Sequence, residues 1–284
     1  QGFKVTYLPV DSEGFVLEED LKNAITPETT VVSIMLANNE IGTVQRIKDL
    51  AEIAKDKKAL FMTDAVQALT KIPVDVEDLN VDLLALSAHK FHGPKGIGAL
   101  YVRKGVKLRP LVYGGGHERG LRSSTENIPG MVGMGKAAEL GIAEMEESVE
   151  RMRRIRDHLI DRTLAAVPRT YLNGPRDERR LCNNAHFRFD FIEGEGMVLF
   201  LDMQGIAAST GSACSTKSLE PSHVLRSLGL RHEQCHGSLR LSLSKFNIME
   251  EADYFIETIP SIIERLRKMS PLGEGVSYDV PTVQ

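Results

Sequence analysis

Short apolar runs alternate with helical patterns over the first hundred residues, and this alternation constrains the fold more than any other feature. Between the second and third runs, Leu50, Ile53 and Ala54 recur at helical spacing. Strands that alternate with helices predict an α/β fold, a mostly parallel sheet sandwiched by helices. The candidate strands are Phe3–Val10, Val31–Leu36, Leu60–Met62, Val81–Leu86 and Gly98–Val102.

The second half of the chain has a different pattern. Two long helical patterns cover about 129–147 and 148–167. An alternating strand at His186–Phe191 and helices at Met197–Met203 and Tyr254–Lys268 follow them. This mixture predicts a smaller α+β domain. For a chain of 284 residues we therefore expect two domains, residues 1–140 and residues 141–284.

Charge and composition exclude several classes of protein. Lys and Arg number 35 against 39 Asp and Glu, so the chain lacks the positive charge typical of nucleic-acid binding. We find no apolar run long enough to span a membrane. Cys182, Cys214 and Cys235 are far apart and show no zinc-binding spacing, which favours a reducing, cytoplasmic setting and no metal. We interpret His232 and His236, which flank Cys235, as a chance cluster.

Three polar clusters follow predicted strands, at Asn38–Glu40, Asp64–Gln67 and Ser87–Lys90. Because the strands are parallel, we expect all three clusters at one edge of the sheet. A lysine among apolar neighbours loses its proton more readily, and a neutral amine forms Schiff bases. An aspartate that keeps a pyridine nitrogen protonated makes the ring an electron sink. Alone, Lys90 would be interpreted as a solvated lysine and Asp64 as a helix N-cap, but together they predict pyridoxal 5'-phosphate.

Cys214 lies among small residues at 208–216, a segment that we call the cysteine loop. Small residues on both sides predict an accessible, flexible loop, which is the setting that a reactive thiolate requires. Cys182 lies in or before a strand, so we expect it to be a buried apolar residue. Cys235 remains ambiguous.

Six motifs occur in order along the chain and together resemble one family. They resemble the cysteine desulfurases of the NifS/IscS type, within the class V aminotransferases of pyridoxal-phosphate fold type I. The resemblance covers essentially the whole chain, and the cysteine loop is similar to that of the group with a long loop. Relative to the family, we expect the sequence to lack the N-terminal region. The motifs are Asn38–Gly42, Asp64–Gln67, Ser87–Gly96, Gly114–Asn127, Ser209–Cys214 and Leu219–Leu225.

The resemblance implies how the cofactor would be bound. Lys90 would bind pyridoxal phosphate covalently, Asp64 would pair with the pyridine nitrogen, and Gln67 would contact the phenolic oxygen. Asn39 is also implied as a cofactor contact. The phosphate contacts would come from Ser87, His89 and, across a homodimer interface to the partner subunit's phosphate, Thr125.

The resemblance also implies the reaction. L-cysteine would become L-alanine, and its sulfur would pass to Cys214 as a persulfide. Asn39 and Arg240 would hold the substrate carboxylate, a task that suits the planar guanidinium of arginine. The sulfur would go on to an acceptor, commonly a scaffold protein of the IscU or NifU kind, for iron–sulfur cluster assembly or other sulfur delivery.

Two alternatives stay open. Another class V enzyme, an aminotransferase or a selenocysteine lyase, would use Lys90 and Asp64 equally well, and only Cys214 with its loop distinguishes them. A truncated, non-catalytic chain that acts as a binding partner is the second alternative. One departure from the family pattern is Ser124, at a position where the family more often has glycine.

Overall fold

The computed structural model describes residues 2–211 and 221–270, which divide into two compact units. The first unit contains residues up to 10, 15–38 and 43–150. The second contains residues 11–14, 39–42 and the chain from 151 onward. The second unit therefore includes two short segments from the N-terminal part of the chain. The domain boundary that we expect at residue 140 stays a prediction.

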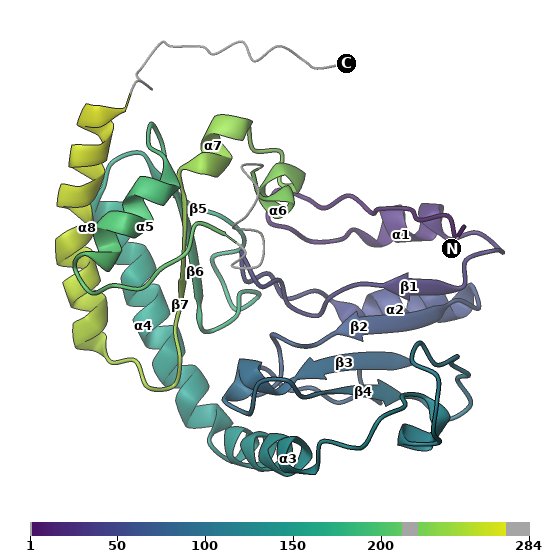
Figure 1. Ribbon diagram of the computed structural model, residues 1–284. Coiled ribbons are helices and arrows are strands. Elements are labelled where there is room, and N and C mark those ends of the chain that lie inside the picture. Colours follow the sequence, from purple (N-terminus) through teal and green to yellow (C-terminus); the bar gives the residue numbers. More distant parts are fainter. Residues whose placement is uncertain (1, 212–220, 271–284) are drawn as a thin grey trace. The chain divides into compact units, whose positions relative to one another are not determined.

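The first unit is built on a four-stranded, mostly parallel sheet (Figure 1). Its order is β1-β2-β3-β4, in which β1–β2 and β2–β3 are parallel and β3–β4 is antiparallel. The predicted α/β fold with a mostly parallel sheet is therefore confirmed. The strands are β1 (Val31–Ser33), β2 (Leu60–Asp64), β3 (Leu83–Ser87) and β4 (Gly98–Val102).

The helices of this unit follow from apolar spacing. In α2, Ile47, Leu50 and Ala54 lie on one buried face. They pack in the apolar core of the first unit, which also includes residues of its sheet. Asn127 caps α3, because its side chain accepts a hydrogen bond from the Gly130 N–H. The helical elements are α1 (Glu18–Ala24), α2 (Ile47–Asp56), η1 (Ala88–Phe91), η2 (Glu118–Gly120) and α3 (Ile128–Ala143).

The strand that we predict at Phe3–Val10 is wrong. This segment belongs to no strand of the structure, although most of its residues are apolar or β-branched. Phe3 and Tyr7 are 78% and 89% exposed, so they contribute no buried face. A pleated run becomes a strand only where a partner strand takes its backbone hydrogen bonds, and the described chain gives this segment none.

The second unit has a three-stranded antiparallel sheet in the order β5-β6-β7. Helices α4, α5 and α8 pack with it around one apolar core that includes Phe187, Phe189 and Ile259 (Figure 1). The elements are α4 (Met145–Ala166, in this unit from residue 151), β5 (Thr170–Leu172), β6 (Asn184–Phe189), α5 (Gly194–Asp202), α6 (His223–Ser227), α7 (His232–His236), β7 (Ser238–Ser242) and α8 (Met249–Met269). This is the α+β mixture predicted for the second half of the chain.

Within the described residues, no helix combines the length and the apolar character needed to cross a membrane.

Candidate cofactor and substrate sites

The carboxyl ends of β1, β2 and β3 meet at one edge of the first unit's sheet. The backbone pairing of β1 and β2 continues past β1, where the Leu36 N–H donates to the Asp64 carbonyl at 2.8 Å. On the other side, the Ala65 N–H donates to the Ala85 carbonyl at 3.0 Å. Asp64 therefore lies on the middle strand end, and Ser87 ends the neighbouring strand at the same edge. The structure brings the second and third polar clusters together as expected from parallel strands.

Asp64 ends β2 and begins a turn. Its Oδ1 accepts a hydrogen bond from the Val66 N–H at 2.8 Å, the contact of a capping side chain. The residues that follow, including the half-buried Gln67, form turns rather than a helix. The carboxylate is half-buried. One carboxylate oxygen thus fixes the local backbone at the strand end.

Ser87, His89 and Lys90 lie on the tight turn that leaves β3. The Ser87 Oγ and the His89 Nδ1 are 2.9 Å apart, so the two side chains share a hydrogen bond. The short helix η1 directs Ala88 and Phe91 into the core, which leaves His89 and Lys90 exposed. In the described chain Lys90 therefore lies on the surface, because this turn buries Ala88 and Phe91 and points the two residues between them outward.

Thr125 is exposed in a stretch between η2 and α3. The preceding Ser123 is buried and donates from its Oγ to the Gly115 carbonyl at 3.0 Å. Between them, Ser124 has φ of +113°, a backbone conformation that side chains with a Cβ rarely adopt. The glycine that the related family more often has at this position would fit that backbone without strain.

In the second unit, the two residues implied in binding the substrate carboxylate lie in direct contact. Arg240, on β7, donates from its Nη1 to the Asn39 carbonyl at 3.2 Å. The Arg240 backbone pairs with Ser209, with N···O distances of 2.6 and 3.3 Å. These contacts place the start of the cysteine loop beside Arg240.

His186 is a buried neighbour of Arg240 that sequence reasoning missed. The two residues face each other across β6 and β7. The His186 Nδ1 is 2.9 Å from the Asn173 Nδ2, so it accepts that amide's hydrogen. Burial, followed by the nearby charges of Arg180 and Arg240, lowers the pKa of His186 to about 3. The imidazole is therefore neutral. In the sequence His186 lies in a strand of alternating apolar residues, and that pattern does not indicate that its ring is buried beside Arg240.

Cys214 lies outside the described residues. Cys182 is buried, as expected for a small apolar residue. Cys235 is also buried and packs with Ile41 and Leu225, and burial raises the pKa of its thiol. Neither buried thiol has the accessible setting of a nucleophile.

His232 and His236 form a pair one helical turn apart, with the His236 Nε2 at 3.1 Å from the His232 Nδ1. In the described part of the chain, no group of three or more His, Cys, Asp and Glu side chains is arranged to hold a metal ion.

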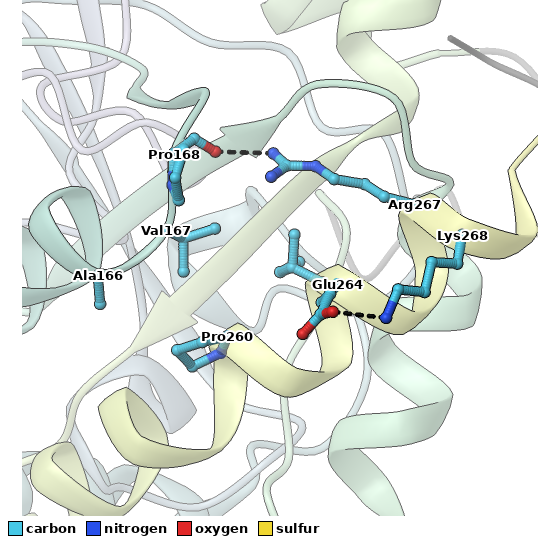
Figure 2. Close-up of a pocket in the computed structure, with 8 residues that line it drawn as sticks. Ala166, Val167, Pro168, Pro260, Glu264, Arg267 and Lys268 are labelled. Carbon is cyan, nitrogen blue, oxygen red and sulfur yellow. Dashed lines mark hydrogen bonds and ion pairs between the residues drawn. The ribbon is translucent and has the colours of Figure 1, made fainter.

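A surface pocket of about 500 Å³ lies away from all of these residues, between the end of α4 and α8 (Figure 2). Its polar groups already have partners within the pocket. Arg267 donates to the Pro168 carbonyl at 2.8 Å, and Lys268 pairs with Glu264 at 2.5 Å. The pocket contains none of the residues implied in the reaction.

The aminotransferase class-V family profile matches residues 1–255 of the chain. The chain belongs to the class-V aminotransferase family. It is 58% identical over 275 residues to the cysteine desulfurase IscS of Clostridium botulinum, and the matched region covers 96% of this chain and 69% of that protein. It is 56% identical to the cysteine desulfurase IscS of Methanosarcina thermophila, over 96% of this chain and 67% of that protein.

Solved structures of NifS-like proteins agree with the fold. A NifS-like protein matches with a TM-score of 0.85 and 42% identity, over 93% of this chain and 69% of that chain. A NifS-like protein from Rickettsia africae matches with a TM-score of 0.83 and 29% identity, over 90% of this chain and 69% of that chain. The chain thus has the pyridoxal-phosphate fold type I that its sequence predicts.

Enzymes of this family depend on pyridoxal phosphate. The chemistry of the side chains at the sheet edge fits this cofactor. Asp64 offers a carboxylate for a pyridinium nitrogen, and Lys90 offers an exposed amine for covalent attachment. Ser87 and His89 lie side by side and offer a hydroxyl and an imidazole to a phosphate group. The described residues of the first unit therefore include an acceptor for the pyridinium end of the cofactor and hydrogen-bonding groups for its phosphate end.

Proposed function

We propose that this chain catalyses the desulfuration of L-cysteine to L-alanine and transfers the sulfur to Cys214. The observation that carries the proposal is the set of Asp64, Ser87, His89 and Lys90 at one sheet edge, in a chain 58% identical to a named cysteine desulfurase. The residue roles below are part of the proposal.

In the first unit, each residue has one task. Ser87 and His89 hold the phosphate by hydrogen bonds, and the negative charge of Asp64 keeps a proton on the pyridine nitrogen. Gln67 contacts the phenolic oxygen. Lys90 attaches the cofactor covalently, and its freed amine then moves the proton at the substrate Cα. When bound, pyridoxal phosphate supplies an electron sink for the negative charge that this proton transfer leaves behind.

In the second unit, Arg240 and Asn39 hold the substrate. The guanidinium binds the carboxylate of cysteine, and the Asn39 carbonyl fixes one of its N–H groups in place. The thiol of Cys214 then forms an S–S bond with the substrate sulfur while the substrate's C–S bond breaks. The electron pair of that bond, with the proton from the Cys214 thiol, makes the C–H bond of alanine. Cys214 is left as a persulfide.

We further propose a cytoplasmic homodimer, in which Thr125 contacts the phosphate held by the partner subunit. The exposure of Thr125 in the described chain supports this role. The sulfur acceptor that we propose is a scaffold protein of the IscU or NifU kind.

The first test is the visible absorption spectrum of the protein with added pyridoxal phosphate. We expect a yellow band in the wild type that the Lys90→Ala variant lacks. Lys95→Ala, which removes a second exposed lysine nearby, is the matched control and should keep the band. A band of equal strength in Lys90→Ala would contradict the assignment of Lys90.

The second test separates desulfuration from transamination. With L-cysteine as substrate, we expect the wild type to form alanine and a persulfide, and Cys214→Ala to form neither. Replacement of the buried Cys182 by alanine should retain the persulfide. If Cys214→Ala still consumes cysteine at the rate of the wild type, the aminotransferase alternative is favoured instead.

A further inference from the structure

Glu40 is a buried carboxylate with no task in the mechanism above. It is 2% exposed and lies in Asn39–Gly42, the short stretch of early sequence in the second unit that we call the anchor segment. A buried carboxylate is costly unless a partner compensates its charge or its lone pairs. The Ser222 hydroxyl donates to the Glu40 Oε2 at 2.6 Å, the short distance of a charge-assisted hydrogen bond.

Ser222 is the N-cap of α6. The same oxygen that donates to Glu40 accepts from the backbone N–H groups of Val224 and Leu225, at 3.2 and 3.5 Å. Leu225 in turn is fully buried against Ile41 of the anchor segment. The carboxylate of Glu40 therefore fixes the start of α6, which follows the cysteine loop in the sequence.

Gly211, within the cysteine loop, also lies close to Glu40. A Cβ placed on Gly211 would lie 3.5 Å from the Glu40 Oε2 and 3.9 Å from the Ser222 Cβ. Gly211 is held by the Ser209 hydroxyl, which donates to its carbonyl at 3.0 Å. Ser209 pairs with Arg240 on β7. Gly211 and Ser222 thus both lie near the Glu40 Oε2, and the Ser222 hydroxyl bonds to it.

The anchor segment has further attachments that do not use this carboxylate. The Asn184 Nδ2 donates to the Glu40 carbonyl at 2.7 Å, and the Leu181 N–H donates to the Gly42 carbonyl at 2.8 Å. Arg240 donates to the Asn39 carbonyl. Loss of the carboxylate would therefore leave Asn39 and Arg240 in contact while it removes the acceptor of the Ser222 hydroxyl.

We propose that Glu40 is a positioning residue for sulfur transfer: its carboxylate holds the start of α6, which follows the cysteine loop in the sequence, at the anchor segment. This inference rests on the proposed role of Cys214. Glu40 acts through Ser222 and the backbone and touches no reacting atom. It sets how often the thiol of Cys214 is placed to react, which is a kcat effect, and it leaves the binding of the cysteine carboxylate unchanged.

The test compares variants of the natural full-length protein after it has been loaded with pyridoxal phosphate. Glu40→Leu keeps the bulk of the side chain and removes the acceptor, and Ser222→Ala removes the donor. Since a hydrogen bond to a charged group is among the stronger kind, we expect each to lower kcat for alanine about 10-fold or more, with KM for cysteine within about twofold. Glu40→Gln, which retains an acceptor oxygen, should restore most of the rate.

Two further measurements separate positioning from general damage. Ser227→Ala removes another hydroxyl from α6, one that donates to the His223 carbonyl, and should leave kcat unchanged. In the cofactor-free protein, Glu40→Leu and Ser222→Ala should speed hydrogen exchange at the amides of Val224 and Leu225, whereas Ser227→Ala should not. The double variant should be no slower than Ser222→Ala, because that substitution already removes the contact between Glu40 and Ser222.

The outcomes are distinguishable. A wild type that forms neither alanine nor a persulfide at Cys214 would overturn the proposed function itself. A wild type that forms both, with Glu40→Leu and Ser222→Ala at its kcat, would overturn only the inference about Glu40. A rise in KM with unchanged kcat would also overturn it, because Glu40 would then serve substrate binding.

Discussion

The buried His186 makes the stability of the second unit depend on pH in a predictable direction. The folded protein holds the pKa of this imidazole at about 3, whereas its ordinary value is 6.5. Between these two values, the unfolded chain binds a proton at His186 that the folded protein excludes. The free energy of unfolding therefore falls as the pH falls below 6.5, and this contribution is complete only near pH 3.

The magnitude follows from proton linkage. One excluded proton lowers the free energy of unfolding by about 1.4 kcal/mol for each pH unit below the unfolded pKa. Between pH 7 and pH 5 the contribution of His186 amounts to about 2 kcal/mol. That is a large part of a net stability that is about 5–15 kcal/mol for a typical domain.

The assay is urea unfolding followed by circular dichroism at pH 7 and pH 5. His186→Asn keeps an oxygen for the Asn173 amide and removes the titrating ring, so its stability should fall by about 2 kcal/mol less than that of the wild type over this interval. His223→Asn, which replaces an exposed histidine, should behave as the wild type does. Equal losses in the wild type and in His186→Asn would refute the reasoning.

Three other substitutions test the packing and the backbone. Ser124→Gly should raise the thermal midpoint by about 2–4 °C, since it relieves a φ of +113° worth about 1 kcal/mol; an unchanged midpoint would mean that no strain is present. Gly42→Ala and Gly205→Ala both place a Cβ at positive φ, but only at Gly42 does that Cβ come within 2.7 Å of the Asn184 Oδ1. In urea titrations Gly42→Ala should thus cost more than Gly205→Ala, and equal costs would contradict the close approach. Phe187→Ala should lower the free energy of unfolding by about 3–5 kcal/mol, because the ring is fully buried; a loss below about 1 kcal/mol would show that the cavity collapses.

The sequence was sufficient to predict the sheet edge of the first unit. Apolar runs end at Asp64 and near Ser87, and parallel strands bring such ends together without further information. Two features were beyond that reasoning. The run at Phe3–Val10 has the composition of a strand but no partner in the described chain, and the outward direction of Lys90 depends on a single turn of η1.

The two residues implied in substrate binding show a different limit. The pairing of Arg240 with Asn39 was implied only by family resemblance, because 201 positions separate the two residues and no local pattern connects them. The contact between Ser222 and Glu40, across 182 positions, carried no signal of any kind. Periodicity describes neighbours along one helix or strand, whereas such contacts depend on how the chain returns to an earlier segment.

The early position of the anchor segment has a consequence for synthesis on the ribosome. Residues 39–42 belong to a unit whose largest part begins at Arg151, more than a hundred positions later. At about 5–20 residues per second, Arg240 is made some 10–40 s after Asn39. For most of that interval Ser222 and Leu225, which contact Glu40 and Ile41 in the folded protein, have not yet been synthesised. A nascent chain halted before β7 (Ser238–Ser242) would contain the first unit's strands but not the contact between Arg240 and Asn39, so the proposed substrate site can form only after Arg240 has been made.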